Sequence, residues 1–176
     1  MVRIVLRVIA AVALLSLACT DDATGPGSQP SPTGGSIGFE GCKSLMAAQS
    51  LDGNDQACIS YVYDGQSILQ LKHINAVFNC CPDSVGGEVQ IDERVIAINE
   101  MEVLTMPCDC ICPFDVDYEI VDLPPGLYTI RVNEIYTYQD MELLEFTVDL
   151  TKAITGDFCV ERELPHVAVS TAVSKM

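Results

Sequence analysis

The sequence predicts an all-β protein, an antiparallel β-sandwich of about eight or nine short strands stapled by disulfides. Three observations lead to this fold class. Apolar and polar residues alternate in several short segments, a period typical of strands with one buried face. Turn signals such as Asp64-Gly65 and Pro124-Pro125-Gly126 separate these segments. No segment carries a convincing long helical pattern, and nine cysteines are available for cross-links.

The clearest strand is expected over residues 108–120. Alternate side chains of a strand point to opposite faces, so one face carries sulfur and hydrocarbon and the other carries mostly carboxylates. Pro113 cannot donate to a ladder and predicts an edge, a bulge or a break. The apolar face, which we expect to lie on the core, consists of Cys108, Cys110, Cys112, Phe114, Val116, Tyr118 and Ile120.

Seven further strands are expected from the same alternation. Asp64-Gly65 predicts a hairpin, residues 79–83 predict a turn that holds two adjacent cysteines, and Pro124-Pro125-Gly126 fits a type II turn. Residues 43–49 favour a short helical turn. The strands are expected at residues 57–64, 67–74, 88–92, 95–99, 128–132, 146–150 and 157–162.

The chain begins with the features of an export signal. Two arginines precede an apolar run over residues 8–17, which is too short to span a bilayer comfortably. The run ends in Leu-Ser-Leu-Ala-Cys, which resembles a bacterial lipoprotein signal; Ala18 fits that pattern, and Ser16 stands where leucine is usual. The resemblance implies lipidation of Cys19 and anchoring to a membrane of the bacterial cell envelope. The alternative is an ordinary cleaved signal in which Cys19 has no role.

Four regions are expected along the chain. Residues 1–18 form the lipoprotein signal peptide, residues 19–38 a disordered tether, residues 39–165 the β-sandwich domain and residues 166–176 a C-terminal tail. The tether is almost wholly Gly, Pro, Ser, Thr and Asp, so its burial of apolar surface cannot offset the entropy lost on ordering. The domain is long enough for one hydrophobic core.

The chain is strongly acidic. Its formal charge is −16, and without residues 1–18 it has 7 Lys and Arg against 25 Asp and Glu, a charge of −18. Such a surface repels nucleic acid and anionic lipid, so we expect no nucleic-acid partner. It suits a divalent cation, a basic partner or simple solubility.

The cysteines predict a disulfide framework. Eight remain when Cys19 is set aside, and an even number in an exported chain is typical of disulfides. Eight cysteines allow 105 pairings. The first and last clear strands are expected to be neighbours in a closed fold, which pairs Cys58 with Cys159.

The other six cysteines are expected to form one cluster. Adjacent cysteines on an extended segment point in opposite directions, so Cys80 and Cys81 should take different partners. Both partners are expected in the triplet within residues 108–112, and the spare triplet cysteine is expected to pair with Cys42. The cluster consists of Cys42, Cys80, Cys81, Cys108, Cys110 and Cys112.

Several motifs resemble known families. Residues 123–132, L-P-P-G-L-Y-T-I-R-V, resemble the turn and strand of immunoglobulin-like and prealbumin-like β-sandwich modules on bacterial surface proteins. The motifs N-C-C-P-D, C-D-C-I-C-P-F-D-V-D-Y-E-I, L-P-P-G-L-Y-T and D-F-C-V-E-R together resemble a group of uncharacterised bacterial cysteine-rich lipoproteins. This resemblance implies an envelope location and a β-sandwich fold, and it implies no activity.

Two kinds of metal site are weighed against the disulfide hypothesis. Cys80, Cys81, Cys108, Cys110 and Cys112 offer thiolates for Cu(I) or Zn(II), or for thiol-redox chemistry. Their spacing is not the C-x₂-C of zinc knuckles and no histidine lies near them, so disulfides are favoured.

The second kind of metal site considered is one for calcium. Asp115, Asp117 and Glu119 share one strand face, and residues 52–55 have loop chemistry without the full EF-hand pattern. Carboxylates spaced by two on a strand point to solvent, whereas calcium ligands usually gather on a loop. We therefore expect no resident metal or cofactor.

No catalytic pattern stands out. The histidines are His73 and His166, and no G-x-S-x-G, H-E-x-x-H or phosphate-loop motif is present. We therefore expect no enzyme and no catalytic residues. The expected function is that of a lipid-anchored binding or structural module with an envelope protein or glycan partner; the alternative is a metal-handling or thiol-redox envelope protein. With no tryptophan in the chain, a sugar platform would depend on Tyr61, Tyr63, Tyr136 and Tyr138.

Overall fold

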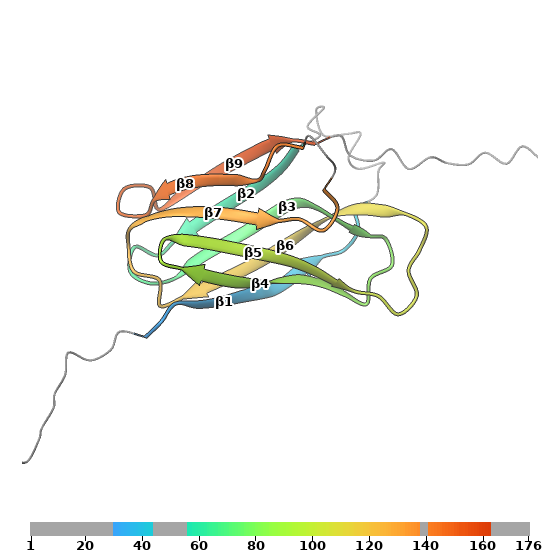
Figure 1. Cartoon of the computed structure of the whole chain (residues 1–176), viewed down its shortest axis with the longest axis horizontal. Coiled ribbons are helices and arrows are strands. Elements are labelled where there is room, and N and C mark those ends of the chain that lie inside the picture. Colours follow the sequence, from blue (N-terminus) through green and yellow to red (C-terminus); the bar gives the residue numbers. More distant parts are fainter. Residues whose placement is uncertain (1–29, 44–55, 138–140, 163–176) are drawn as a thin grey trace, which may run out of the picture.

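The computed structural model describes residues 30–43, 56–137 and 141–162 and shows nine β-strands and no helix in these ranges (Figure 1). The all-β prediction is therefore confirmed for this part of the chain. Within it, no helix has the length and apolar character needed to cross a membrane. The strands are β1 (Thr33–Glu40), β2 (Gln56–Tyr63), β3 (Leu69–Asn79), β4 (Ser84–Asp92), β5 (Val95–Val103), β6 (Ile111–Val121), β7 (Leu127–Asn133), β8 (Glu145–Asp149) and β9 (Thr155–Glu161).

The strands form one continuous sheet rather than two. Their order is β8-β7-β5-β4-β1-β6-β3-β2-β9. The sheet curves until β8 and β9, its two edge strands, lie side by side (Figure 1). Phe146 of β8 stacks there on Phe158 of β9, with 4.9 Å between ring centroids. The result is a nearly closed barrel, and the expected two-sheet sandwich is not confirmed.

One strand pair departs from the expected antiparallel arrangement. β5 and β7 run parallel, with Ile96 opposite Ile130 and Ile98 opposite Val132, whereas the other pairs are antiparallel. The chain leaves β5, crosses to the other wall of the barrel as β6, and returns as β7 beside β5. Parallel neighbours need such a crossover connection, and alternation within a strand carries no information about it.

Strand β6 lies between β1 and β3, and its apolar face forms the centre of the core as predicted. Cys112, Phe114, Val116, Tyr118 and Ile120 are all buried. The first two cysteines of the predicted strand, at positions 108 and 110, precede β6 and lie in the connection that leads into it.

The proline in β6 lies just beyond the end of the β1–β6 ladder, where its carbonyl still accepts a hydrogen bond from the amide of Lys43 at 2.9 Å. Pairing of β6 with β1 ends at Asp115 opposite Glu40, and Pro113 is paired only with Val77 of β3. The missing amide proton of Pro113 therefore interrupts no ladder, and of the expected edge, bulge or break the structure shows a break in the pairing with β1.

The expected boundary of the tether is corrected by strand β1. Thr33–Glu40 pairs along β6 and touches β4, so residues 33–38 belong to the ordered barrel. Composition misled here because backbone pairing, not burial of large side chains, holds this glycine-rich strand. A Cβ at Gly34 would lie 2.8 Å from the carbonyl oxygen of Glu119, so the close approach of β1 to β6 requires glycine.

The turns agree with the predictions in one case and differ in another. Gly65 has a φ of 82°, and the Asp64 carboxylate accepts three backbone N–H bonds across the β2–β3 hairpin. Gly126 has no positive φ, so the predicted type II turn is wrong; Asp122, at φ 59°, takes the left-handed conformation in that connection. The signal peptide, Cys19, the expected helical turn after residue 43 and the C-terminal tail lie outside the described residues.

Candidate functional site: the cysteine end of the barrel

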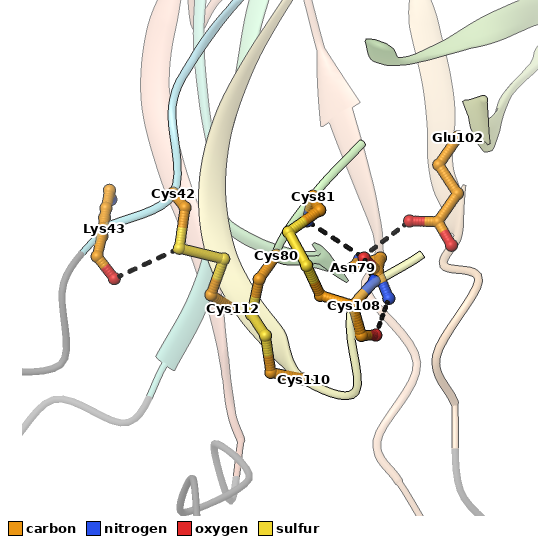
Figure 2. Close-up of a disulfide and its surroundings, with 9 residues drawn as sticks. All are labelled: Cys42, Lys43, Asn79, Cys80, Cys81, Glu102, Cys108, Cys110 and Cys112. Carbon is orange, nitrogen blue, oxygen red and sulfur yellow. Dashed lines mark hydrogen bonds between the residues drawn. A yellow bond between two sulfur atoms is a disulfide. The ribbon is translucent and has the colours of Figure 1, made fainter. Parts of the chain in front are cut away.

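Six cysteines gather at one end of the barrel, here called the cysteine end. They come from three segments: the residues after β1, the turn between β3 and β4, and the connection into β6 together with the first residues of that strand (Figure 2). Three disulfides join these segments. They are Cys42–Cys112, Cys80–Cys110 and Cys81–Cys108, with Cα–Cα distances of 5.8, 5.6 and 5.5 Å.

The fourth disulfide lies on the wall of the barrel. Cys58 of β2 and Cys159 of β9 are directly opposite in the antiparallel pair, with their Cα atoms 4.0 Å apart. All four bridges agree with the pairing expected from the sequence. The agreement has a simple origin, because the first and last clear strands are neighbours and the 80–81 turn packs against the start of β6.

Asn79 organises the peptide backbone of the cysteine end (Figure 2). Its side-chain oxygen accepts hydrogen bonds from the amides of Cys81 and Cys108, both at 3.0 Å, and its side-chain nitrogen donates to the carbonyl of Cys108 at 2.7 Å. The backbone amide of Asn79 donates to the carboxylate of Glu102 at 2.8 Å. Asn79 is buried, so one amide side chain satisfies three backbone groups.

Sequence reasoning missed Asn79 as a member of the site. The available signal was an asparagine directly before a turn, since such side chains bond to the backbone two residues on. The bond from the amide of Cys81 to Asn79 is of this kind. The longer-range bonds to Cys108 depend on the fold.

Three sulfur atoms of the cysteine end lie in one group. The Sγ atoms of Cys42, Cys80 and Cys112 are all within 4.8 Å of one another, although Cys80 is bonded to Cys110. Cys42 is exposed, Cys80 is half-buried and Cys112 is 4% exposed. The Sγ of Cys80 in one disulfide therefore lies within 4.8 Å of both sulfurs of the other disulfide, one of which belongs to the exposed residue Cys42.

This sulfur group differs from the metal-ligand set considered in the sequence. It includes Cys42 and omits Cys110 as well as Cys81 and Cys108, which are bonded to each other. Thiolates bind Cu(I) or Zn(II), and disulfide sulfurs carry no such charge. The arrangement in the structure thus fits a staple, and a metal would require reduced cysteines.

The acidic face of β6 does not gather into a calcium site among the described residues. Asp115 is buried and lies 2.5 Å from the ammonium of Lys43, while Asp117 lies 3.7 Å from the ammonium of Lys72. The prediction that Asp115 points to solvent is therefore wrong. Lys43 and the amide of Asn75 cover this carboxylate where β3 bulges, and residues 52–55 lie outside the described ranges.

The tyrosines proposed for a sugar platform are not presented together at the surface. Tyr61 and Tyr63 are buried, and the hydroxyl of Tyr63 donates to the carbonyl of Leu123 at 2.9 Å. Tyr136 donates to Glu102 at 2.7 Å, and Tyr138 lies outside the described residues.

A second polar group, absent from the sequence predictions, lies inside the barrel. His73 of β3 and Glu100 of β5 are buried, and the Nδ1 of His73 lies 2.6 Å from the Oε1 of Glu100. The hydroxyl of Tyr118 of β6 donates to the same Glu100 oxygen at 3.3 Å. Burial, and then the adjacent Glu100 carboxylate, raise the pKa of Tyr118 far above its ordinary value. Because both the histidine and the carboxylate are screened from solvent, this group fits a structural role better than a substrate site.

The position of His73 was readable from the sequence. Leu69, Leu71 and His73 alternate on β3, and all three are buried. The positive φ of Asn75 marks the bulge after which Ala76 and Phe78 become the buried residues. No pattern in the sequence marked Glu100 as the partner of His73, because this pairing depends on which strands face each other across the barrel.

Comparison of the chain with protein-family models, with curated proteins and with solved structures found no match. The function is therefore argued from the residues themselves.

Proposed function

We propose that this chain is a lipid-anchored module of a bacterial envelope, in which a disulfide-stapled barrel is held away from the membrane and binds an envelope protein or glycan or serves a structural role. Three features support the proposal. The N-terminal segment resembles a lipoprotein signal that ends at Cys19. Four disulfides suit an oxidising compartment outside the cytoplasm. The high negative charge favours solubility.

The direction in which β1 runs along the barrel is the observation that carries the proposal. Thr33 at the start of β1 lies opposite Val121 at the end of β6, whereas Cys42 just after β1 is bonded to Cys112 at the start of β6. The chain therefore enters the barrel at the end opposite the cysteine end (Figure 1). The 14 residue steps from Cys19 to Thr33 reach at most roughly 50 Å when fully extended, so an anchor at Cys19 would attach the tether to the end of the barrel opposite the cysteine end.

The cysteine end also carries exposed apolar side chains. Val103 is the last residue of β5, Leu104 and Met106 lie in the connection just after it, and Met106 is 79% exposed. Exposed apolar groups gathered at a surface are typical of an interaction site. The disulfides would hold the backbone around them in one conformation and so lower the entropy lost on binding.

Lipidation is tested by Cys19→Ser. The variant should leave the membrane fraction or accumulate as the uncleaved precursor, with a mass that lacks the lipid. Ser28→Ala, in the same tether, is the matched control and should fractionate as the wild type. Unchanged fractionation and unchanged mass of Cys19→Ser would contradict the anchor.

The role of the cysteine end is tested separately, with two exposed apolar residues that lie at opposite ends of the barrel. Met106→Asp should abolish cross-linking of the protein to envelope components in intact cells. Leu127→Asp at the tether end, where Leu127 is 58% exposed, should leave the cross-links unchanged. Equal effects of the two variants would remove the cysteine end from the proposal without affecting the anchor.

A second candidate function is metal handling or thiol-redox chemistry, favoured by the sulfur group of Cys42, Cys80 and Cys112. Thiol counting on protein isolated from the envelope distinguishes the candidates. A stapled module should have four bridges and no free thiol once Cys19 is modified. Several free thiols together with stoichiometric copper or zinc would favour metal handling.

A further inference from the structure

We propose that Cys42, Cys80 and Cys112 form an intramolecular thiol–disulfide exchange centre, in which opening of the Cys42–Cys112 bridge transfers the free thiol from Cys112 to Cys110. The inference goes beyond the anchored module and holds whether or not the chain is lipidated. It rests on the contact between two disulfides at the cysteine end.

The entry point is the sulfur of Cys42, which is an exposed residue. A disulfide is opened when a thiolate attacks one of its sulfurs, and access decides which sulfur is attacked. Cys42 is exposed and its partner Cys112 is buried, so an external thiol reaches Cys42 first. A new bond forms between the external sulfur and Cys42, the Cys42–Cys112 bond breaks, and Cys112 leaves as a thiolate.

The Cys112 thiolate then has a second disulfide within reach. The Sγ of Cys80 lies within 4.8 Å of the Sγ of Cys112. Attack on Cys80 forms a Cys80–Cys112 bond and breaks the Cys80–Cys110 bond, and the Cys110 thiolate takes a proton from water. One thiol and one disulfide exist before and after this step, so it needs no oxidant or reductant.

The direction of transfer follows from solvation. Burial disfavours a thiolate, and Cys112 is 4% exposed and packed in the hydrophobic core. Cys110 is half-buried and lies in the connection before β6. Cys80 lies in a turn and Cys110 and Cys112 are two residues apart, so Cys80 can change partner with a local movement. The exchange would move a reactive thiol from the core to a half-buried position in the connection before β6.

Cys42→Ser tests the transfer without an added reductant, because it leaves Cys112 with no partner. The protein is quenched and denatured in acid, its free thiol is labelled with N-ethylmaleimide, and the bridges are mapped by mass spectrometry. We expect the label on Cys110 and a Cys80–Cys112 bridge. A label on Cys112 with an intact Cys80–Cys110 bridge would overturn the proposal.

Cys159→Ser is the matched control. It leaves Cys58 unpaired on the wall of the barrel, away from the sulfur group. The label should stay on Cys58 and the other three bridges should be unchanged. Migration of this thiol as well would mean that scrambling is general, and would also overturn a dedicated centre.

The wild-type protein provides an independent measurement if Cys42→Ser does not fold. After brief exposure to a limiting amount of glutathione, the acid-quenched protein should carry glutathione on Cys42 and a free thiol on Cys110. In the double variant Cys80→Ser with Cys110→Ser, the free thiol should remain on Cys112. Free Cys112 in the glutathione-treated wild type would show that no transfer occurs.

Discussion

The imidazole Nδ1 of His73 and the carboxylate Oε1 of Glu100 lie 2.6 Å apart in the interior of the barrel, and both side chains are fully buried. They come from β3 and β5, which are not neighbours in the sheet. The contact therefore spans the barrel and connects its two walls. Tyr118 of β6 donates to the same carboxylate oxygen, so three strands meet at one polar group.

Removal of either partner of this pair should be costly. His73→Leu leaves the Glu100 carboxylate buried without its main partner, and Glu100→Leu does the same to His73. Each variant is expected to lose about 3–5 kcal/mol of unfolding free energy, as for other buried pairs that lose one member. The double variant leaves neither partner and should lose less than the sum of the two.

Urea unfolding of the four proteins measures this coupling. Additivity within about 0.5 kcal/mol, the usual result for independent sites, would contradict a direct interaction between His73 and Glu100.

Alkaline pH should destabilise the protein through Tyr118. Burial, followed by the charge of Glu100, raises the pKa of this phenol in the folded state. Above about pH 10 the unfolded chain loses a proton that the folded chain keeps, so the free energy of unfolding falls by about 1.4 kcal/mol per pH unit for this group. This contribution to stability is complete below pH 10 and is lost as the pH rises.

Tyr118→Phe should remove that one-proton slope. The measurement is the free energy of unfolding of both proteins between about pH 9 and pH 11, a range that spans the ordinary tyrosine pKa of about 10. An unchanged slope in the variant would show that Tyr118 is not the group responsible.

The disulfides should differ in their contribution to stability. The Cys58–Cys159 bridge joins residues 101 apart in sequence, and the Cys81–Cys108 bridge joins residues 27 apart. In the chain-entropy model, replacing both cysteines by serine costs up to about 4.7 kcal/mol for the longer loop and well below about 3.6 kcal/mol for the shorter one, because the remaining Cys80–Cys110 bridge closes nearly the same loop. Denaturant unfolding of the two double variants gives the order, and a reversed order would contradict the loop-length account.

Two neighbouring glycines in β1 test whether this strand is part of the barrel. At Gly34 an added Cβ would lie 2.8 Å from both the carbonyl oxygen of Glu119 and a side-chain carbon of Ile120. Gly34→Ala should therefore cost about 1–3 kcal/mol, as overpacking usually does. At Gly35 the nearest atom would be 4.0 Å away, so Gly35→Ala should stay within about 0.5 kcal/mol of the wild type.

Thermal or denaturant unfolding distinguishes the two alanine variants. If residues 33–38 formed only a tether, both substitutions would be equally harmless.

The strands and their buried faces were predictable because alternation is a local property of the chain. Phe114, Val116 and Tyr118 alternate with acids, and the strand pleat sends them to the core whatever the neighbouring strands are. The disulfide pairing was predictable for a related reason. Cysteines at the ends of expected neighbours have few possible partners, and the adjacent pair Cys80 and Cys81 must use different ones.

Beyond the β2–β3 hairpin and the β2–β9 pair, the tertiary structure decided which strands are neighbours, because that choice depends on contacts between residues far apart in the chain. It closed the sheet into a barrel through Phe146 and Phe158, placed β5 parallel to β7, and brought His73 against Glu100 across the interior. It also ordered the glycine-rich β1, since backbone hydrogen bonds to β6 hold a strand that has little apolar surface of its own to bury. The sequence predicted the cluster of six cysteines, but the fold decided that the Cys42–Cys112 and Cys80–Cys110 bridges are the two that bring Cys42, Cys80 and Cys112 within 4.8 Å of one another.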